Sequence, residues 1–86
     1  MAKYSIKITK TAQKQLDKLA QQVADTLIEV ILSLALNPRP VGYIKLKGRN
    51  AYRVRKNNYR IIYEIMDNVL IVTIITIGHR KEIYRK

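Results

Sequence analysis

The chain lacks several features that define other classes of protein. It contains no cysteine and a single histidine among 86 residues, so it has no disulfide framework and no thiolate metal site, which suits a reducing cytoplasm. The N-terminus lacks the apolar core of a signal peptide, and the longest apolar run, residues 69–77, is far shorter than the roughly 20 residues that span a bilayer as a helix. We expect a cytoplasmic protein with no membrane contact. With no glycine-rich phosphate loop and no Cys or His cluster, we also expect no cofactor and no metal.

Acidic residues are scarce too. Seventeen Lys and Arg face six Asp and Glu, which gives a net charge of +11. Residues 1–38 carry a net charge of +2, whereas residues 39–86 carry +9 and hold all seven arginines. The planar fork of arginine matches phosphate oxygens in pairs. The composition therefore indicates a polyanionic partner (nucleic acid, a membrane surface or an acidic protein) that binds the second half of the chain.

Hydrophobic periodicity predicts one small domain spanning residues 1–86. Alternation over residues 4–8 predicts a strand, and Thr9 or Thr11 is a suitable N-cap for a helix from Ala12. After a break at residues 21–22, a second helical stripe runs to a stop near Asn37, because proline follows. Residues 37–50 are expected to form an irregular connection.

The segment 52–64 reads as two strands joined by a turn at Asn57-Asn58, since asparagine tolerates a positive φ. A tight turn at Asp67-Asn68 should lead into a central strand at 69–77 that is covered on both faces, and Gly78 should let the chain turn away. The predicted order is β-α-α-β-β-β, an α+β domain with both helices on one face of a mainly antiparallel sheet.

Strand alternation groups basic residues on one face of this sheet. If Tyr52 and Val54 pack inward, Arg53 and Arg55 point the other way, and Arg60 joins them. Three guanidinium groups on a solvated face repel one another, and a polyanion would relieve that repulsion. Such a set, with Arg80 and Tyr84 from the tail, can stabilise a pentacoordinate phosphate and so support RNA cleavage by the 2′-hydroxyl of the substrate, a route closed to DNA.

The ordered runs KLKG (45–48), YRVR (52–55), YRIIYE (59–64) and GHR (78–80), followed by Tyr84, resemble the RelE group of the RelE/ParE superfamily of toxins. The resemblance implies a fold similar to microbial ribonucleases and a metal-independent mRNA endonuclease that cuts in the ribosomal A site. It also implies an acidic RelB-like antitoxin as partner, with operator DNA contacted only through the antitoxin complex.

The resemblance further implies roles for individual residues. Arg53 and Arg55 match two basic positions, often lysines, that contact the phosphate and are candidates for activating the 2′-hydroxyl. Arg60 matches the arginine that stabilises the transition state, Arg80 the one that assists the leaving oxygen, and Tyr84 an aromatic that positions the base or phosphate. Further RNA contacts are expected from basic residues around this set: Lys45, Lys47, Arg49, Lys56, Lys81 and Arg85.

Two questions stay open at this point. Arginine remains protonated and is a poor base, so the reaction relies either on electrostatics and in-line alignment or on proton transfer by His79, which is otherwise a structural residue at a strand end. A ParE-like toxin that inhibits DNA gyrase without cutting nucleic acid is the alternative function. A catalytically weak relative that binds antitoxin and operator DNA as a repressor component is a third.

Overall fold

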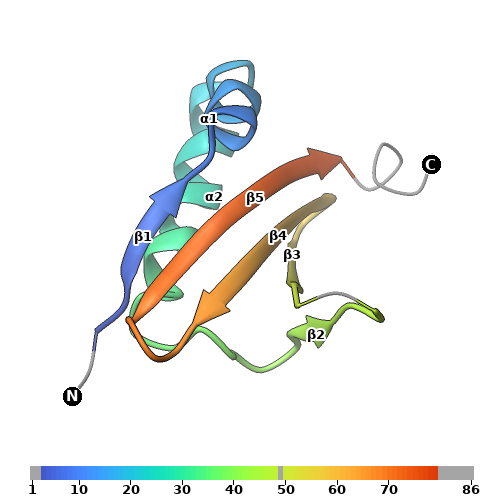
Figure 1. The fold of residues 1–86 in the computed structure, drawn as a ribbon. Coiled ribbons are helices and arrows are strands. Elements are labelled where there is room, and N and C mark those ends of the chain that lie inside the picture. The colour runs from blue at the N-terminus through green and yellow to red at the C-terminus, as the bar shows by residue number, and fades with distance from the viewer. Residues whose placement is uncertain (1–2, 49, 80–86) are drawn as a thin grey trace.

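The protein folds as a mixed sheet with both helices on one face (Figure 1). The structure is a computed structural model that describes residues 3–48 and 50–79. Its elements are β1 (Ser5–Ile8), α1 (Lys10–Asp17), α2 (Gln21–Ser33), β2 (Ile44–Lys45), β3 (Tyr52–Lys56), β4 (Tyr59–Met66) and β5 (Ile71–His79). The strand order is β1-β5-β4-β3-β2, with β1 parallel to β5 and the other pairs antiparallel. The predicted α+β class is confirmed.

The core lies between α2 and the sheet face that turns toward it. Every second residue of β3 and β4 points to this side, as alternation predicts. Burying these side chains removes apolar surface from water, at about 25 cal/mol per Å². The buried set combines strand and helix residues: Leu16, Leu27, Ile31, Leu34, Val54, Ile61, Tyr63, Val72, Ile74 and Ile77.

Both helices begin close to where the sequence predicts. Thr9 is the N-cap of α1, and its hydroxyl oxygen accepts a hydrogen bond from the backbone N–H of Ala12 at 3.2 Å. The second helix starts at Gln21 itself, so the break falls earlier than predicted, at residues 18–20. It ends at Ser33, and a turn over residues 34–36 follows. Neither helix in the described part of the chain is long and apolar enough to cross a membrane.

The strands follow the prediction in the hairpin and depart from it in β5. Asn57 has a φ of 56° in the two-residue turn between β3 and β4, as expected. The next turn is longer than predicted, because Leu70 also adopts a positive φ and β5 starts at Ile71. The middle strand is β4 rather than β5, and the β5 side chains on the far face are only half-buried. Gly78 lies inside β5 instead of turning the chain away.

A bulge interrupts the pairing of β4 with β5. Tyr63 pairs with Ile74, but Ile62 pairs with Thr76, so Ile75 is an extra residue in β5. A one-residue insertion reverses the face on which every later side chain lies. After the bulge, Ile77 enters the core and Gly78 lies directly opposite Arg60.

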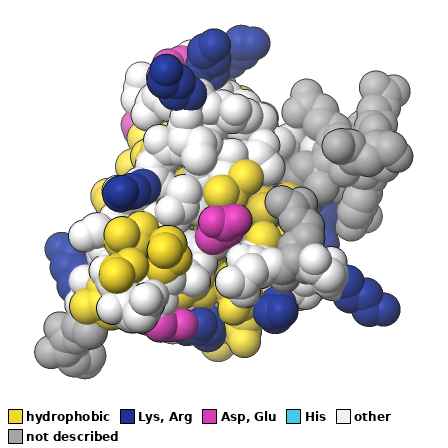
Figure 2. Space-filling view, viewed as in Figure 1, with side chains coloured by type: hydrophobic (Ala, Val, Ile, Leu, Met, Phe, Trp, Pro, Cys, Tyr) yellow, Lys and Arg dark blue, Asp and Glu magenta, His cyan; other side chains and the backbone are white. Residues whose placement is uncertain are grey.

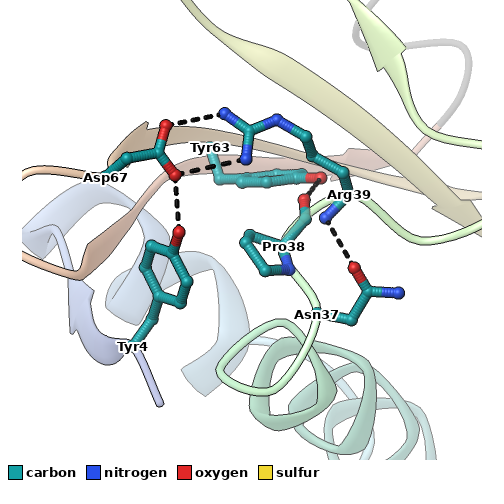
Figure 3. Close-up of polar contacts among 6 residues, drawn as sticks. All are labelled: Tyr4, Asn37, Pro38, Arg39, Tyr63 and Asp67. Carbon is teal, nitrogen blue, oxygen red and sulfur yellow. Dashed lines mark hydrogen bonds and ion pairs between the residues drawn. The ribbon is translucent and has the colours of Figure 1, made fainter. Parts of the chain in front are cut away.

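The connection at 37–50 is more ordered than an irregular loop, because it contains the two-residue strand β2. It is also held at its start by polar contacts (Figure 3). The hydroxyl of Tyr63 donates to the carbonyl oxygen of Pro38 at 2.7 Å. The guanidinium of Arg39 donates to both carboxylate oxygens of Asp67, at 3.2 and 2.8 Å, and it also lies 5.6 Å from the ring centroid of Tyr52. Arg39 therefore ties the loop to the β4–β5 turn.

Candidate nucleic-acid interface

Three arginines share the sheet face that turns away from the helices, and we call this surface the arginine face (Arg53, Arg55 and Arg60). Arg55 and Arg60 are directly opposite each other in the β3–β4 ladder, and Arg53 lies two residues along β3. Residues directly opposite in an antiparallel ladder have Cβ atoms about 4.5–5.5 Å apart and point to the same side. The grouping predicted from strand alternation is therefore present.

The three arginines differ in their exposure to solvent. Arg55 is exposed and Arg53 is half-buried, but the side chain of Arg60 is 0% exposed. The expectation of a solvated Arg60 is wrong, because this residue lies on the middle strand, between Arg55 on β3 and Gly78 on β5. A buried guanidinium interacts more strongly with a nearby charge than an exposed one does, since less water screens it.

His79 lies on the opposite side of the sheet from these arginines. It pairs with Tyr59, which packs against the core, and the two rings meet edge to face with centroids 5.5 Å apart. This contact supports the structural role for His79 that the sequence left open. The register therefore separates its ring from the guanidinium groups of the arginine face.

The lysines expected to contact RNA are placed differently from the arginines. Lys45 pairs with Tyr52 and Lys56 with Tyr59, so both lie on the helix side of the sheet, and Lys47 follows β2 in a turn. All three are exposed. The remaining predicted site residues lie outside the described part of the chain: Arg49, Arg80, Lys81, Tyr84 and Arg85.

Asp67, which sequence analysis did not single out, accepts hydrogen bonds from two other side chains. Hydrogen bonds from Arg39 and then from Tyr4 lower the pKa of Asp67 to about 2. The same carboxylate raises the pKa of the Tyr4 hydroxyl, which donates to it. Arg39 is thus paired within the fold. No local sequence signal links these residues, because Tyr4 and Asp67 are 63 positions apart.

Figure 2 views the sheet from the side away from α2. Acidic side chains lie near the middle, at the lower edge and at the upper left of this view, whereas Lys and Arg lie mostly around the periphery. Positive charge is therefore unevenly distributed on this side of the molecule.

Across the described residues, no group of three or more His, Cys, Asp or Glu side chains is arranged to hold a metal ion.

Comparison with known proteins assigns the chain to a family. Residues 6–84 match the ParE toxin family of the type II toxin–antitoxin system parDE. This match covers more than half of the chain, so the protein belongs to that family. It is a RelE-type toxin within the family, as its similarity to curated toxins and solved structures indicates.

Three relatives illustrate the RelE relationship. The chain is 29% identical over 85 residues to Toxin RelG of Mycobacterium tuberculosis, covering 96% of this chain and 98% of that protein. It is 28% identical over 86 residues to the mRNA interferase toxin RelE of Escherichia coli strain K12, covering 94% and 90% of the two chains. A crystal structure of the archaeal RelE–RelB complex from Pyrococcus horikoshii OT3 superposes over 100% of both chains, with a TM-score of 0.82 and 28% identity.

Proposed function

We propose that this toxin is an endoribonuclease that cleaves mRNA in the A site of the ribosome and so stops translation. The observation that carries the proposal is the direct opposition of Arg55 and Arg60 on neighbouring strands, with Arg53 on the same face. The name of the Escherichia coli relative, an mRNA interferase, supports the same reaction class. The substrate class follows from the chemistry, because the arginines complement phosphate and only RNA carries the attacking hydroxyl.

In the proposed reaction the 2′-oxygen of the substrate forms a bond to the adjacent phosphorus as its proton is lost. The bond from phosphorus to the 5′-oxygen of the next nucleotide then breaks, and that oxygen takes up a proton. The products are a 2′,3′-cyclic phosphate and a free 5′-hydroxyl. Negative charge accumulates on the phosphoryl oxygens between these steps, and positioned cations stabilise charge at that stage most strongly.

Each arginine has a distinct part in this proposal. Arg53 and Arg55 contact the scissile phosphate, and the buried Arg60 stabilises the charge of the pentacoordinate state. We place Arg80 beside the leaving oxygen and Tyr84 against the base or phosphate. Lys45, Lys47 and Lys56 bind flanking phosphates, together with Arg49, Lys81 and Arg85. Because arginine is a poor base, catalysis relies on charge stabilisation and in-line alignment of the 2′-oxygen.

The same proposal includes an acidic, RelB-like antitoxin as partner. The net charge of +11 favours a negatively charged chain that wraps the toxin, and the relative from Pyrococcus horikoshii was solved as a RelE–RelB complex. Operator DNA would be contacted only through this complex, and the toxin would act in the cytoplasm, where mRNA is translated. Co-expression with the adjacent reading frame should yield a small acidic chain that co-purifies, and its absence would contradict this part.

The cleavage proposal is tested on ribosomes programmed with a defined mRNA. Wild-type protein should cut the mRNA in the A-site codon, and a single 2′-deoxy substitution at that codon should abolish the cut. Arg55→Ala should lower kcat by about 100-fold, the cost of removing one donor to a developing negative charge. Lys56→Ala removes the same charge from the next residue but from the other sheet face, so it should raise KM and leave kcat nearly unchanged.

Metal independence is tested separately, since ribosomes themselves require magnesium. Sulfur replaces each non-bridging oxygen of the scissile phosphate in turn, and manganese is then added. A metal bound directly to that oxygen would restore cleavage of one thio-substrate, because manganese accepts sulfur more readily than magnesium does. We expect no such rescue, because guanidinium groups take the place of the metal.

A second function keeps some support, because the matching family is described as the ParE toxin. A ParE-like toxin would inhibit DNA gyrase by binding and would leave mRNA intact. Purified protein is therefore added to a gyrase supercoiling assay and, in parallel, to programmed ribosomes. Inhibition of supercoiling with uncut mRNA would replace the cleavage proposal with this one.

A further inference from the structure

Side chains from α1 and its N-cap contact β5 at the bulge, where strand pairing with β1 has ended. The last β1–β5 pair joins Ile8 to Ile74. Immediately beyond it, the hydroxyl of Thr9 donates to the carbonyl oxygen of Ile75 at 2.9 Å. Further along, the backbone N–H of Ile77 donates to the side-chain Oε1 of Gln15 at 2.6 Å. Two side chains therefore replace a neighbouring strand along the second half of β5.

Gln15 makes a second contact with the same segment. Its Nε2 lies 3.0 Å and its Oε1 3.2 Å from the hydroxyl oxygen of Thr76. One amide thus bridges a side chain and a backbone N–H of two consecutive residues just after the bulge. Leaving a partly buried N–H without an acceptor destabilises the fold, so these contacts favour the bulged register over its alternatives.

The alternative register would change what faces Arg60. Without the extra residue, Arg60 would lie opposite Ile77, and Tyr59 would lie opposite Gly78 instead of His79. Ile77 would then leave the core, where it is now buried, and its branched side chain would crowd the buried guanidinium. In the observed register Gly78, which has no side chain, lies opposite Arg60.

We propose that Gln15, together with Thr9, is a positioning residue that sets the geometry of the arginine face through the register of β5. Among the described residues its side-chain amide bonds to Thr76 and to the backbone N–H of Ile77. Its effect is transmitted through the bulge, which places Gly78 opposite Arg60. The inference rests on the proposed cleavage function for its effect on rate, but the effect on register can be measured without it.

The test uses three variants of the full chain on programmed ribosomes. Gln15→Met removes both polar contacts at similar volume, and Gln15→Glu keeps an acceptor for the Ile77 N–H and the Thr76 hydroxyl. Gln13→Met is the matched control, because Gln13 lies on the exposed side of the same helix, where its amide donates to the carboxylate of Asp17 at 3.0 Å. We expect Gln15→Met to lower kcat at least tenfold, as an approximate scale for a misplaced site, with little change in KM. Gln15→Glu should recover most of that loss, and Gln13→Met should behave as wild type.

NMR measurements on the same proteins separate the two parts of the inference. In Gln15→Met, the amide of Ile77 should exchange faster and the cross-strand contact between Arg60 and Gly78 should weaken. If that contact and the cleavage rate both stay unchanged, or if Gln15→Glu is as slow as Gln15→Met, the proposal is wrong. If wild-type protein does not cleave mRNA, the cleavage function fails and the Arg60–Gly78 contact alone decides the role of Gln15. Should Gln15→Met not fold, Thr76→Val removes one of the same contacts at constant shape and takes its place.

Discussion

The guanidinium of Arg39 holds both carboxylate oxygens of Asp67, 28 positions away in the sequence, and so joins the loop before β2 to the turn after β4. The pair is partly exposed, so each contact alone is weak. Its geometry is nevertheless bidentate, and Tyr4 donates to the same carboxylate. Asp67 thus joins three segments of the chain: the residues just before β1, the loop before β2 and the β4–β5 turn.

Acid should destabilise the fold through Asp67. Hydrogen bonds from Arg39 and then from Tyr4 lower its pKa to about 2 in the folded protein, below the usual range of an aspartate. A carboxyl with a lowered folded pKa stabilises the fold above its unfolded pKa, and this contribution disappears as the pH falls toward the folded value. The free energy of unfolding, measured by urea denaturation, should therefore fall between about pH 4 and pH 2. Asp67→Asn should show a shallower decline over this range, and an identical decline in both proteins would contradict the assignment.

Alkali should act through Tyr63, for the opposite reason. Burial raises the pKa of this hydroxyl to about 12. An unfolded tyrosine ionises near pH 10, so the unfolded chain loses this proton first and stability should fall between about pH 10 and pH 12. Tyr63→Phe should remove this part of the pH dependence. It should also lower the free energy of unfolding at pH 7 by about 1 kcal/mol, because the Pro38 carbonyl loses its donor.

Replacing Arg60 by methionine should separate folding from catalysis. The side chain is fully buried, and a methionine of similar length can fill much of its space. Removing one member of a buried polar interaction lowers stability, so the thermal midpoint should fall, and cleavage is compared at a temperature at which both proteins are folded. Cleavage on programmed ribosomes should fall by about 100-fold or more. A variant that folds and retains the wild-type rate would remove Arg60 from the mechanism.

Replacing His79 by alanine should leave the pH dependence of cleavage unchanged. Its ring packs against Tyr59 on the helix side of the sheet, away from the arginine face. A small loss of stability is expected, because an edge-to-face aromatic contact contributes about 0.5–1.5 kcal/mol. The pH–rate profile of Arg53→Lys is measured alongside, since a lysine at that position can titrate where arginine cannot. If His79→Ala lost one limb of the pH–rate profile, His79 would have to be assigned a role in proton transfer.

Much of the sheet could be predicted because its information is local. The turn at Asn57 needs a residue that tolerates positive φ, and alternation from Tyr52 onward fixes which side chains point inward. The same alternation places Arg53, Arg55 and Arg60 on one face. Alternation does not specify what surrounds a residue, however, so the burial of Arg60 followed only from its position on the middle strand.

The bulge in β5 could not be read from the sequence. Residues 71–77 are all β-branched, so either register satisfies the pattern equally well. The register depends instead on Gln15, which accepts a hydrogen bond from the backbone N–H of Ile77. These two residues are 62 positions apart in the sequence. Thr9 was identified only as a helix cap, and its second contact with Ile75 depends on the same distant pairing.

The parallel pairing of β1 with β5 also bears on how the toxin is made. Within the described residues β1 pairs with no other strand, so the first strand to be synthesised must wait for the last before it can join the sheet. Such a long-range pairing forms late in folding. A nascent polypeptide whose fifth strand is still inside the ribosomal tunnel has neither the bulge nor the Arg60–Gly78 pair. The arginine face therefore reaches its final geometry only after β5 has left the tunnel and paired with β1 and β4.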